Sequence, residues 1–196
     1  MIRKVMMKRP LICGLLVMGI FVVSTQTSNA KPTKTILDYY NALKVKLGIH
    51  KNFKIEKQDI ANGYLSVSAP VPGLPASKTI TMALWRSRDG KDLIGVFSFS
   101  CSGMGCWGDL QDFKIFNADL QEVQKQALDW QILEARFKAP IKPAGAGNFP
   151  KDLVKIKVNI PQKGTTIKIY KGVMGVESKL MATLVYNYNK GTFSIL

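Results

Sequence analysis

The hydrophobic pattern changes along the chain from a helical repeat to the alternation that is typical of β-strands. The helical part carries apolar side chains at intervals of three or four residues: Ile36, Tyr40, Leu43 and Leu47. This spacing places them on one face of an amphipathic helix. Thr35 and Asp38 have the spacing of a capping box, and Gly48 is suited to follow a helix end. The pattern predicts one short N-terminal helix.

Farther along, the period changes to two. Residues 79–84 and 93–100 alternate in this way around Asp89-Gly90, and Asp-Gly between alternating apolar positions is a strong signal for a β-hairpin. A shorter strand is predicted over residues 64–68, and a connection rich in proline and glycine separates it from the hairpin.

The C-terminal third repeats the alternation. Residues 154–160 and 167–170 alternate apolar with polar side chains, mainly lysine, around a turn at residues 161–164. This pattern predicts a second hairpin with one apolar face and one lysine face. Residues 180–188 and 192–196 predict two last strands joined by a turn.

The middle of the chain allows two interpretations. Residues 113–116 predict a strand, and beyond it apolar side chains at helical spacing favour a helix from about Gln124. Residues 122–124 are also compatible with a strand that completes a hairpin. We predict the helix and keep the hairpin as the alternative.

Together these elements predict the fold class α+β. An N-terminal helix, with or without a second helix mid-chain, is expected to pack on a mainly antiparallel, hairpin-rich β-sheet. Of the 196 residues, the 166 after position 30 are enough for one domain and fewer than two domains usually need. Residues 31–196 are therefore predicted to form a single mature domain.

Residues 1–30 have the order of a secretory signal peptide, with a basic start, an apolar run over residues 11–23 and a polar end. Ser28 and Ala30 supply the small residues of a cleavage site, so cleavage is predicted after Ala30. An uncleaved anchor is the alternative, but the apolar run is shorter than the roughly 20 residues of a membrane-spanning helix. We expect a periplasmic or secreted protein with no integral membrane span in the mature form.

The mature chain is strongly basic. Its signal peptide carries four basic residues and no acid, so cleavage lowers the formal charge from +15 to +11. Such a charge favours anionic partners, which outside the cytoplasm include an anionic envelope component or another exported protein. A solvated, lysine-rich surface without a ligand is the alternative.

Two cysteines remain after cleavage, Cys101 and Cys106. A closely spaced, even pair in an exported protein predicts a disulfide, and closing so short a ring contributes roughly 2 kcal/mol. A redox site ordinarily has Cys-x-x-Cys beside a helix start, and a zinc site needs four ligands where this chain offers two thiols and one histidine. We expect a structural disulfide, no metal and no cofactor.

Two motifs resemble sites of enzymes. Residues 103–108 spell Gly-x-Gly-x-x-Gly, but loop and strand are predicted after them where the dinucleotide motif needs a helix, so no nucleotide is expected. Asp109 and Asp112 provide two carboxylates, as many hydrolases require, although their spacing does not by itself indicate a shared cleft. No residue is assigned a catalytic role, and we expect no enzymatic activity.

Two features are candidate binding sites. Lys155, Lys157 and Lys168 share the polar face of the second hairpin, where they form a basic strip suited to a polyanion. Met104 and Trp107 flank the glycine-rich disulfide loop, and a rigid loop with such side chains is a good recognition element. The alternatives are an ordinary solvated face and a Trp107 that folds back into the core. Further lysines extend the strip: Lys151, Lys163 and Lys171.

The chain resembles a group of small exported bacterial proteins of unknown function. The resemblance lies in the runs at residues 62–65, 82–86, 89–91 and 93–96, which lead to the paired cysteines. It implies export and a β-rich fold, and it implies no particular activity.

The Cys-x4-Cys loop alone is similar to the inhibitory loop of Ivy-type periplasmic inhibitors of vertebrate lysozyme. In that family a histidine of the loop enters the lysozyme cleft, whereas this chain has Ser102, Gly103, Met104 and Gly105 there.

The resulting hypothesis is an exported, non-enzymatic binding protein that uses the disulfide loop or the lysine face. One alternative is a cell-envelope hydrolase or wall-processing accessory with carboxylate chemistry. The other is a protein similar to the periplasmic lysozyme inhibitors.

Overall fold

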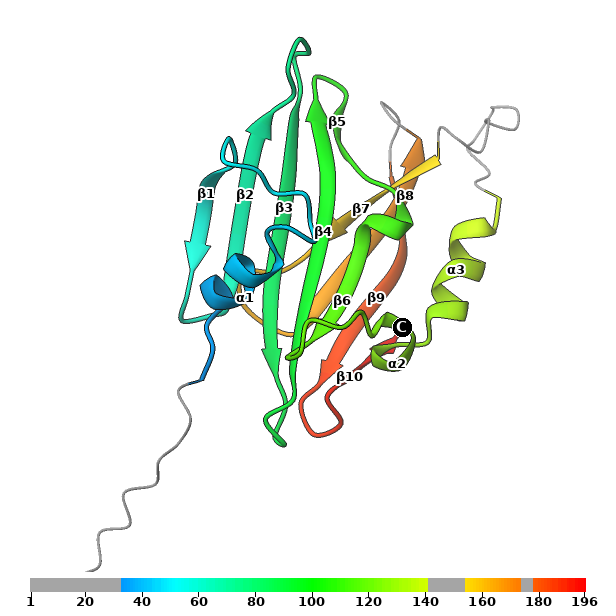
Figure 1. The fold of residues 1–196 in the computed structure, drawn as a ribbon. Coiled ribbons are helices and arrows are strands. Elements are labelled where there is room, and N and C mark those ends of the chain that lie inside the picture. Colours follow the sequence, from blue (N-terminus) through cyan, green and yellow to red (C-terminus); the bar gives the residue numbers. More distant parts are fainter. Residues whose placement is uncertain (1–32, 141–153, 174–177) are drawn as a thin grey trace, which may run out of the picture. The chain divides into compact units, whose positions relative to one another are not determined.

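The computed structural model describes residues 33–140, 154–173 and 178–196 (Figure 1). The predicted signal peptide, residues 1–30, lies outside the described residues, and so does most of the predicted loop at 140–150. Among the described residues no helix is both long and apolar enough to cross a membrane.

The first sheet is an antiparallel meander in which each of its first four strands pairs with the next. The predicted turn at Asp89-Gly90 joins the third and fourth strands, and Gly90 adopts the positive φ of 70° that this turn needs. The sixth strand pairs with the fourth beyond the short fifth strand. The strands are β1 (Lys54–Asp59), β2 (Tyr64–Pro70), β3 (Ser77–Arg86), β4 (Asp92–Ser102), β5 (Gly105–Trp107) and β6 (Phe113–Asn117).

The second sheet has four antiparallel strands in the order β10-β9-β8-β7, and it is also a meander. Its strands follow the alternation seen in the sequence, with turns where proline, glycine and asparagine cluster. They are β7 (Val154–Asn159), β8 (Thr166–Val173), β9 (Lys179–Asn187) and β10 (Thr192–Ile195).

The prediction of one sheet was therefore too simple, although a mainly antiparallel fold built from hairpins is confirmed. The central strands β3 and β4 bury both of their faces. One face carries Ile80 and Met82 in a cluster with α1 (Ile36–Leu43), and the other carries Trp85 and Phe97 in a cluster with the second sheet. Alternation along a strand does not reveal whether one face or both are covered.

Helix α1 begins at the predicted capping box. The Thr35 backbone N–H donates to an Asp38 carboxylate oxygen at 2.7 Å, and Asp38 N–H donates back to the Thr35 hydroxyl at 3.4 Å. The helix ends at Leu43, earlier than the hydrophobic pattern suggested, and residues 44–48 continue as turns up to Gly48 with φ of 63°.

The predicted mid-chain helix is present as two short helices, α2 (Gln124–Ala127) and α3 (Trp130–Lys138). The Asp129 carboxylate accepts a hydrogen bond from Ile132 N–H at 3.3 Å and so caps the start of α3. Just before α2, Glu122 forms an isolated β-bridge with Phe116. Each interpretation of this segment therefore describes part of it.

Candidate binding surface

The two cysteines form the predicted disulfide across the β4–β5 hairpin. Cys101 and Cys106 are directly paired, with their Cα atoms 4.0 Å apart. The chain turns through Gly103 and Met104, and Gly105 takes a φ of 100° that disfavours any residue with a side chain. The Met104 side chain is 59% exposed at the tip. The glycine-rich run thus forms a hairpin turn and opens no helix.

Trp107 is partly buried. It is neither fully exposed on the loop nor folded into the core, which were the two alternatives considered from the sequence. Its indole N–H donates to the Met104 carbonyl at 3.1 Å, and its ring lies over Gly172 of β8. A Cβ atom at position 172 would be 3.0 Å from the Trp107 ring. The glycine therefore makes room for the tryptophan on the second sheet.

Gly108 joins the hairpin to the second sheet. Its N–H and carbonyl each form a 2.9 Å hydrogen bond with the backbone of Ile156 in β7. A Cβ atom here would lie 2.8 Å from both the Phe97 ring and the Ser98 carbonyl oxygen. Only glycine permits this close approach of three backbone segments.

The three predicted lysines share the outer face of the second sheet. Lys155 is paired with Gly172, Lys157 with Tyr170, and Lys168 with Asn159. Lys157 and Lys168 are exposed, whereas Lys155 is partly buried and binds the Asp109 carboxylate at 2.8 Å. Because Lys155 is opposite the glycine that Trp107 covers, the disulfide hairpin and the lysine face meet along one side of the molecule.

We call this joined region the basic surface and define it as Met104, Trp107, Lys155, Lys157 and Lys168. A hollow of about 390 Å³ lies along its hairpin end, between Trp107 and Lys155. Lys78 and three serines of β4 also line the hollow: Ser98, Ser100 and Ser102.

Lys171 does not belong to the lysine face, which corrects an expectation from the sequence. It is only 8% exposed and alternates with Ile167 and Ile169 on the core side of β8. Its ammonium group donates to backbone carbonyls at the C-terminus of α3, including that of Phe137. Burial lowers the pKa of Lys171. Lys151 lies outside the described residues.

The C-terminal segment that forms the second sheet is strongly basic. From Val154 to Leu196 the sequence has seven lysines and a single acid, Glu177. The described strands of the second sheet therefore carry no carboxylate side chain of their own. Asp109, which follows β5 in the first sheet, supplies the one ion pair to a lysine of β7 or β8 within the described residues.

Asp109 and Asp112 lie close together, but they serve the local backbone. An Asp112 carboxylate oxygen accepts the Asp109 backbone N–H at 3.0 Å around the short 3-10 helix η1 (Leu110–Asp112). The Asp109 carboxylate is engaged by Lys155. Both carboxylates have partners in the described structure.

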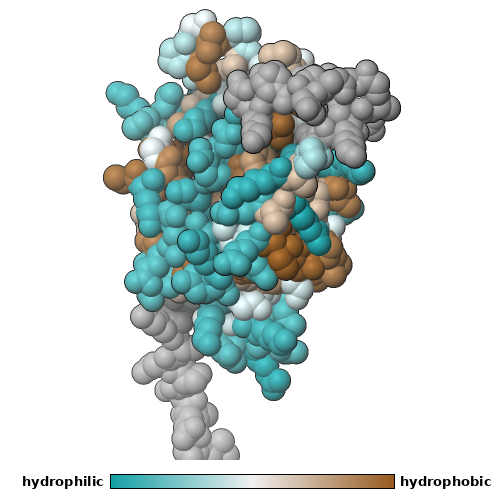
Figure 2. All heavy atoms as spheres, turned by 90° about the vertical axis from the view of Figure 1, so that its right-hand side faces the viewer, coloured by the Kyte–Doolittle hydropathy of each residue, from teal (hydrophilic) through white to brown (hydrophobic). Residues whose placement is uncertain are grey.

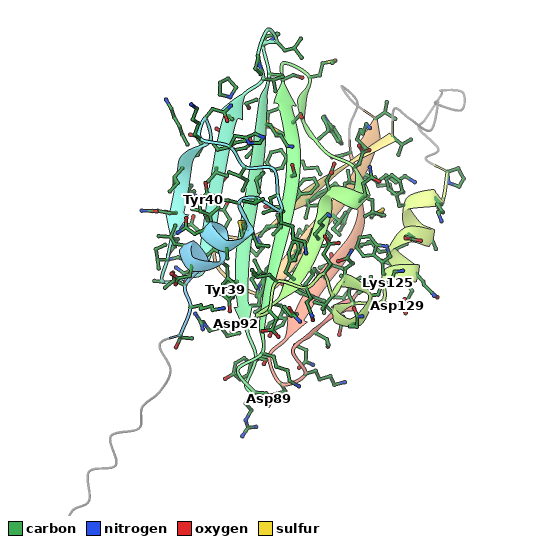
Figure 3. The ribbon with its side chains drawn as sticks, in the orientation of Figure 1. Tyr39, Tyr40, Asp89, Asp92, Lys125 and Asp129 are labelled. Atoms are coloured by element: carbon green, nitrogen blue, oxygen red, sulfur yellow. A yellow bond between two sulfur atoms is a disulfide. The ribbon has the colours of Figure 1, made fainter. Side chains whose placement is uncertain are left out.

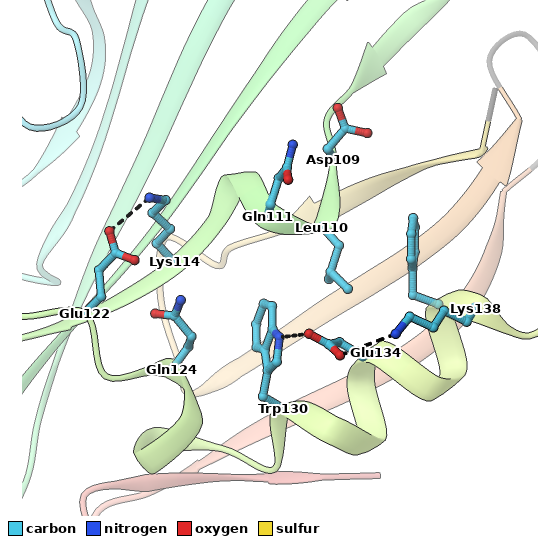
Figure 4. Close-up of a pocket in the computed structure, with 10 residues that line it drawn as sticks. Asp109, Leu110, Gln111, Lys114, Glu122, Gln124, Trp130, Glu134 and Lys138 are labelled. Carbon is cyan, nitrogen blue, oxygen red and sulfur yellow. Dashed lines mark hydrogen bonds and ion pairs between the residues drawn. The ribbon is translucent and has the colours of Figure 1, made fainter. Parts of the chain in front are cut away.

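A second hollow, of about 540 Å³, lies between α3 and the η1–β6 segment (Figure 4). The Trp130 indole N–H donates to Glu134 at 2.6 Å, and Lys138 lies 3.7 Å from the same carboxylate. Lys114 binds Glu122 at 2.9 Å, and this hydrogen bond lowers the pKa of Glu122. This hollow was not apparent from the sequence, because its residues come from three separate segments.

A buried polar cluster fastens α1 to the first sheet (Figure 3). The Tyr39 hydroxyl donates to Asp92 at 2.7 Å, and Arg86 lies 3.6 Å from the same carboxylate. Burial, followed by the hydrogen bond to Asp92, raises the pKa of Tyr39. Burial also raises the pKa of nearby Tyr186 to about 12. These partners hold elements in place and do not line either hollow.

Within the part of the chain that the structure describes, no three histidine, cysteine or carboxylate side chains gather as a metal site would require. Comparisons of the chain with models of known protein families, with curated proteins and with solved structures found no match.

Proposed function

We propose that this chain is an exported, non-enzymatic binding protein whose basic surface holds an anionic component of the cell envelope. One observation carries the proposal. Trp107 packs over Gly172, directly opposite Lys155, so the two features that the sequence presents separately form one continuous surface.

The electrostatics support an anionic ligand. Lys157 and Lys168 are exposed and make no ion pair within the described residues. An exposed ammonium group is well hydrated, so each lysine alone binds weakly. Several lysines on one rigid sheet attract a polyanion together, because each contact releases counterions from it.

The hairpin adds a second type of contact. The disulfide and the indole hydrogen bond hold the tip in one conformation, so a ligand does not have to order this loop on binding. Trp107 offers an apolar ring at the same hollow as Lys155 and the exposed Lys78. A ligand that combines negative charge with an apolar or planar portion fits this combination.

The alternatives of an envelope hydrolase and of a lysozyme inhibitor stay predictions. A hydrolase needs a carboxylate free to act on substrate. Asp109, Glu122 and Glu134 each have an ion-pair partner in the structure. A binding role does not require a free carboxylate that exchanges protons with a substrate.

Heparin retention of the mature protein tests the proposal. We expect Lys157→Glu with Lys168→Glu to elute at clearly lower salt, with the slope of log affinity against log salt falling by about one for each lysine that no longer meets the polyanion. The matched control is Lys57→Glu with Lys125→Glu, which makes the same change in net charge on exposed residues of β1 and α2.

Equal elution of the two double variants would refute the proposal, because only net charge would then matter. The contribution of the hairpin is tested by recovering partners from an envelope extract with the mature protein and with Trp107→Ala. If every partner is recovered equally by both, the hairpin has no part in binding.

A further inference from the structure

Two large apolar side chains are exposed at neighbouring turns of the first sheet. Leu74, in the β2–β3 turn, is 63% exposed, and Met104, in the β4–β5 turn, is 59% exposed. Of the two, only Met104 was a candidate from the sequence. A single exposed leucine or methionine is common on protein surfaces. Two of them at neighbouring turns indicate a surface that contacts an apolar partner.

The strand register shows that both turns project from the same end of the sheet. Pro70 pairs with Ser77, Ser77 with Cys101, and Cys101 with Cys106, so these four residues form one row across β2 to β5. Both turns lie just beyond this row, at the upper end of Figure 1. Their centres are two strand spacings apart, about 10 Å.

Both projections are stiff. Pro72 and Pro75 restrict the β2–β3 turn, which is closed by hydrogen bonds from Val71 N–H to the Ala76 carbonyl at 2.9 Å and from Leu74 N–H to the Val71 carbonyl at 3.2 Å. The disulfide closes the other turn. The two apolar side chains are therefore presented with little conformational entropy left to lose on binding.

The two turns carry one lysine and no carboxylate. Residues 70–78 and 101–108 contain no acid. Lys78, next to the shared row, is exposed and lines the same hollow as Lys155, whose ammonium group is engaged by Asp109 of that hollow. Hydrophobic side chains emerge among polar ones at this upper end in Figure 2. Apolar tips with an exposed lysine set just behind them match the order of layers in a membrane, where anionic headgroups cover hydrocarbon.

We propose that this end of the domain docks on an anionic lipid surface, with Leu74 and Met104 inserted among the acyl chains and Lys78 beside the headgroups. The inference rests on the proposed function, since it names a lipid headgroup as the anion that the basic surface meets. Two inserted side chains anchor a protein weakly and reversibly, so attachment depends on the lysines as well.

The test is flotation of the mature protein with vesicles of phosphatidylglycerol and phosphatidylethanolamine, and with vesicles of phosphatidylcholine alone. We expect binding to the anionic vesicles only. Leu74→Ser and Met104→Ser should each weaken it about tenfold, because each removes several methylene groups from the hydrocarbon. Heparin retention of the Leu74→Ser variant should stay unchanged, because Leu74 lies outside the basic surface.

The matched control is Val45→Ser with Leu180→Ser, which removes two other exposed apolar side chains, 93% and 50% exposed, from the turn after α1 and from β9. It should bind vesicles like the unaltered protein. Circular dichroism and the thermal midpoint check that all variants are folded.

Three outcomes overturn the inference. The first is no flotation of a protein that heparin still retains, and the second is equal flotation of the tip and control variants. The third is self-association that depends on Leu74 and Met104 without vesicles, which would assign the tips to a second copy of the chain. Each leaves the proposed function standing, because that function is tested by the lysine variants on heparin.

Discussion

Gly108 is the residue on which the joining of the two sheets depends, and Gly108→Ala tests this directly. The new Cβ would lie 2.8 Å from the Phe97 ring and 2.8 Å from the Ser98 carbonyl oxygen. Real Cβ atoms do not come so close, so the backbone at position 108 has to move away from β4. That movement strains the two 2.9 Å hydrogen bonds to Ile156.

The expected loss of stability follows from these contacts. Overpacking a well-packed position costs about 1–3 kcal/mol, and weakening two backbone hydrogen bonds costs up to about 1 kcal/mol each. Alanine restricts the unfolded chain and returns about 0.4–1 kcal/mol. At the middle of these ranges the net loss is about 2 kcal/mol, which lowers the urea midpoint by about 1 M for a slope of about 2 kcal/mol per M.

Gly103→Ala is the matched control. Gly103 lies at the tip of the same hairpin and has no positive φ, and a Cβ atom added there would meet no other atom within 4 Å. The same chemical change there should leave stability unchanged or raise it by up to about 1 kcal/mol. Urea unfolding followed by fluorescence compares the two variants. Equal midpoints would show that Gly108 is not under steric constraint.

Three further predictions concern stability. The Cys101→Ser, Cys106→Ser double variant should lose about 2 kcal/mol in urea unfolding, and a loss near zero would contradict the chain-entropy estimate. Lys171→Met should lose about 1–3 kcal/mol because carbonyls of α3 lose their donor, whereas Lys168→Met on the exposed face should change stability by less than about 0.5 kcal/mol. Because burial raises the pKa of Tyr186 to about 12, the folded state keeps its proton where the unfolded state loses it, so stability should fall as the pH rises from about 10 to 12. Tyr186→Phe should make that decline shallower in unfolding measured across this range, and an unchanged slope would refute this origin.

Local signals in the sequence predicted much of the secondary structure. Asp89-Gly90 predicted the β3–β4 turn and Thr35 with Asp38 predicted the start of α1, because each acts through neighbours a few residues away. Strand β1 (Lys54–Asp59) was missed because nearly all of it is exposed. An edge strand covered on neither face has no reason to alternate, and its lysines protect the edge from pairing.

The candidate site also has residues that the sequence predicted correctly and one that it misplaced. The residue types of the basic surface were apparent from the alternation of Lys155 and Lys157 with apolar neighbours. Lys171 was misplaced because its position on the core side of β8 depends on the α3 carbonyls that bind it. Nothing near Lys171 in the sequence identifies those carbonyls, which belong to residues more than thirty positions earlier.

The sequence by itself determined the hairpins, the disulfide between Cys101 and Cys106 and the basic character of the C-terminal strands, since each depends on local spacing or on composition. Tertiary structure alone decided that there are two sheets, that Gly108 bridges them, and that Trp107 lies opposite Lys155. These features arise where segments far apart in the sequence approach each other, as Gly108 does Ile156 and Trp107 does Gly172. The closeness of that approach depends on how the two apolar faces pack, which no local pattern encodes.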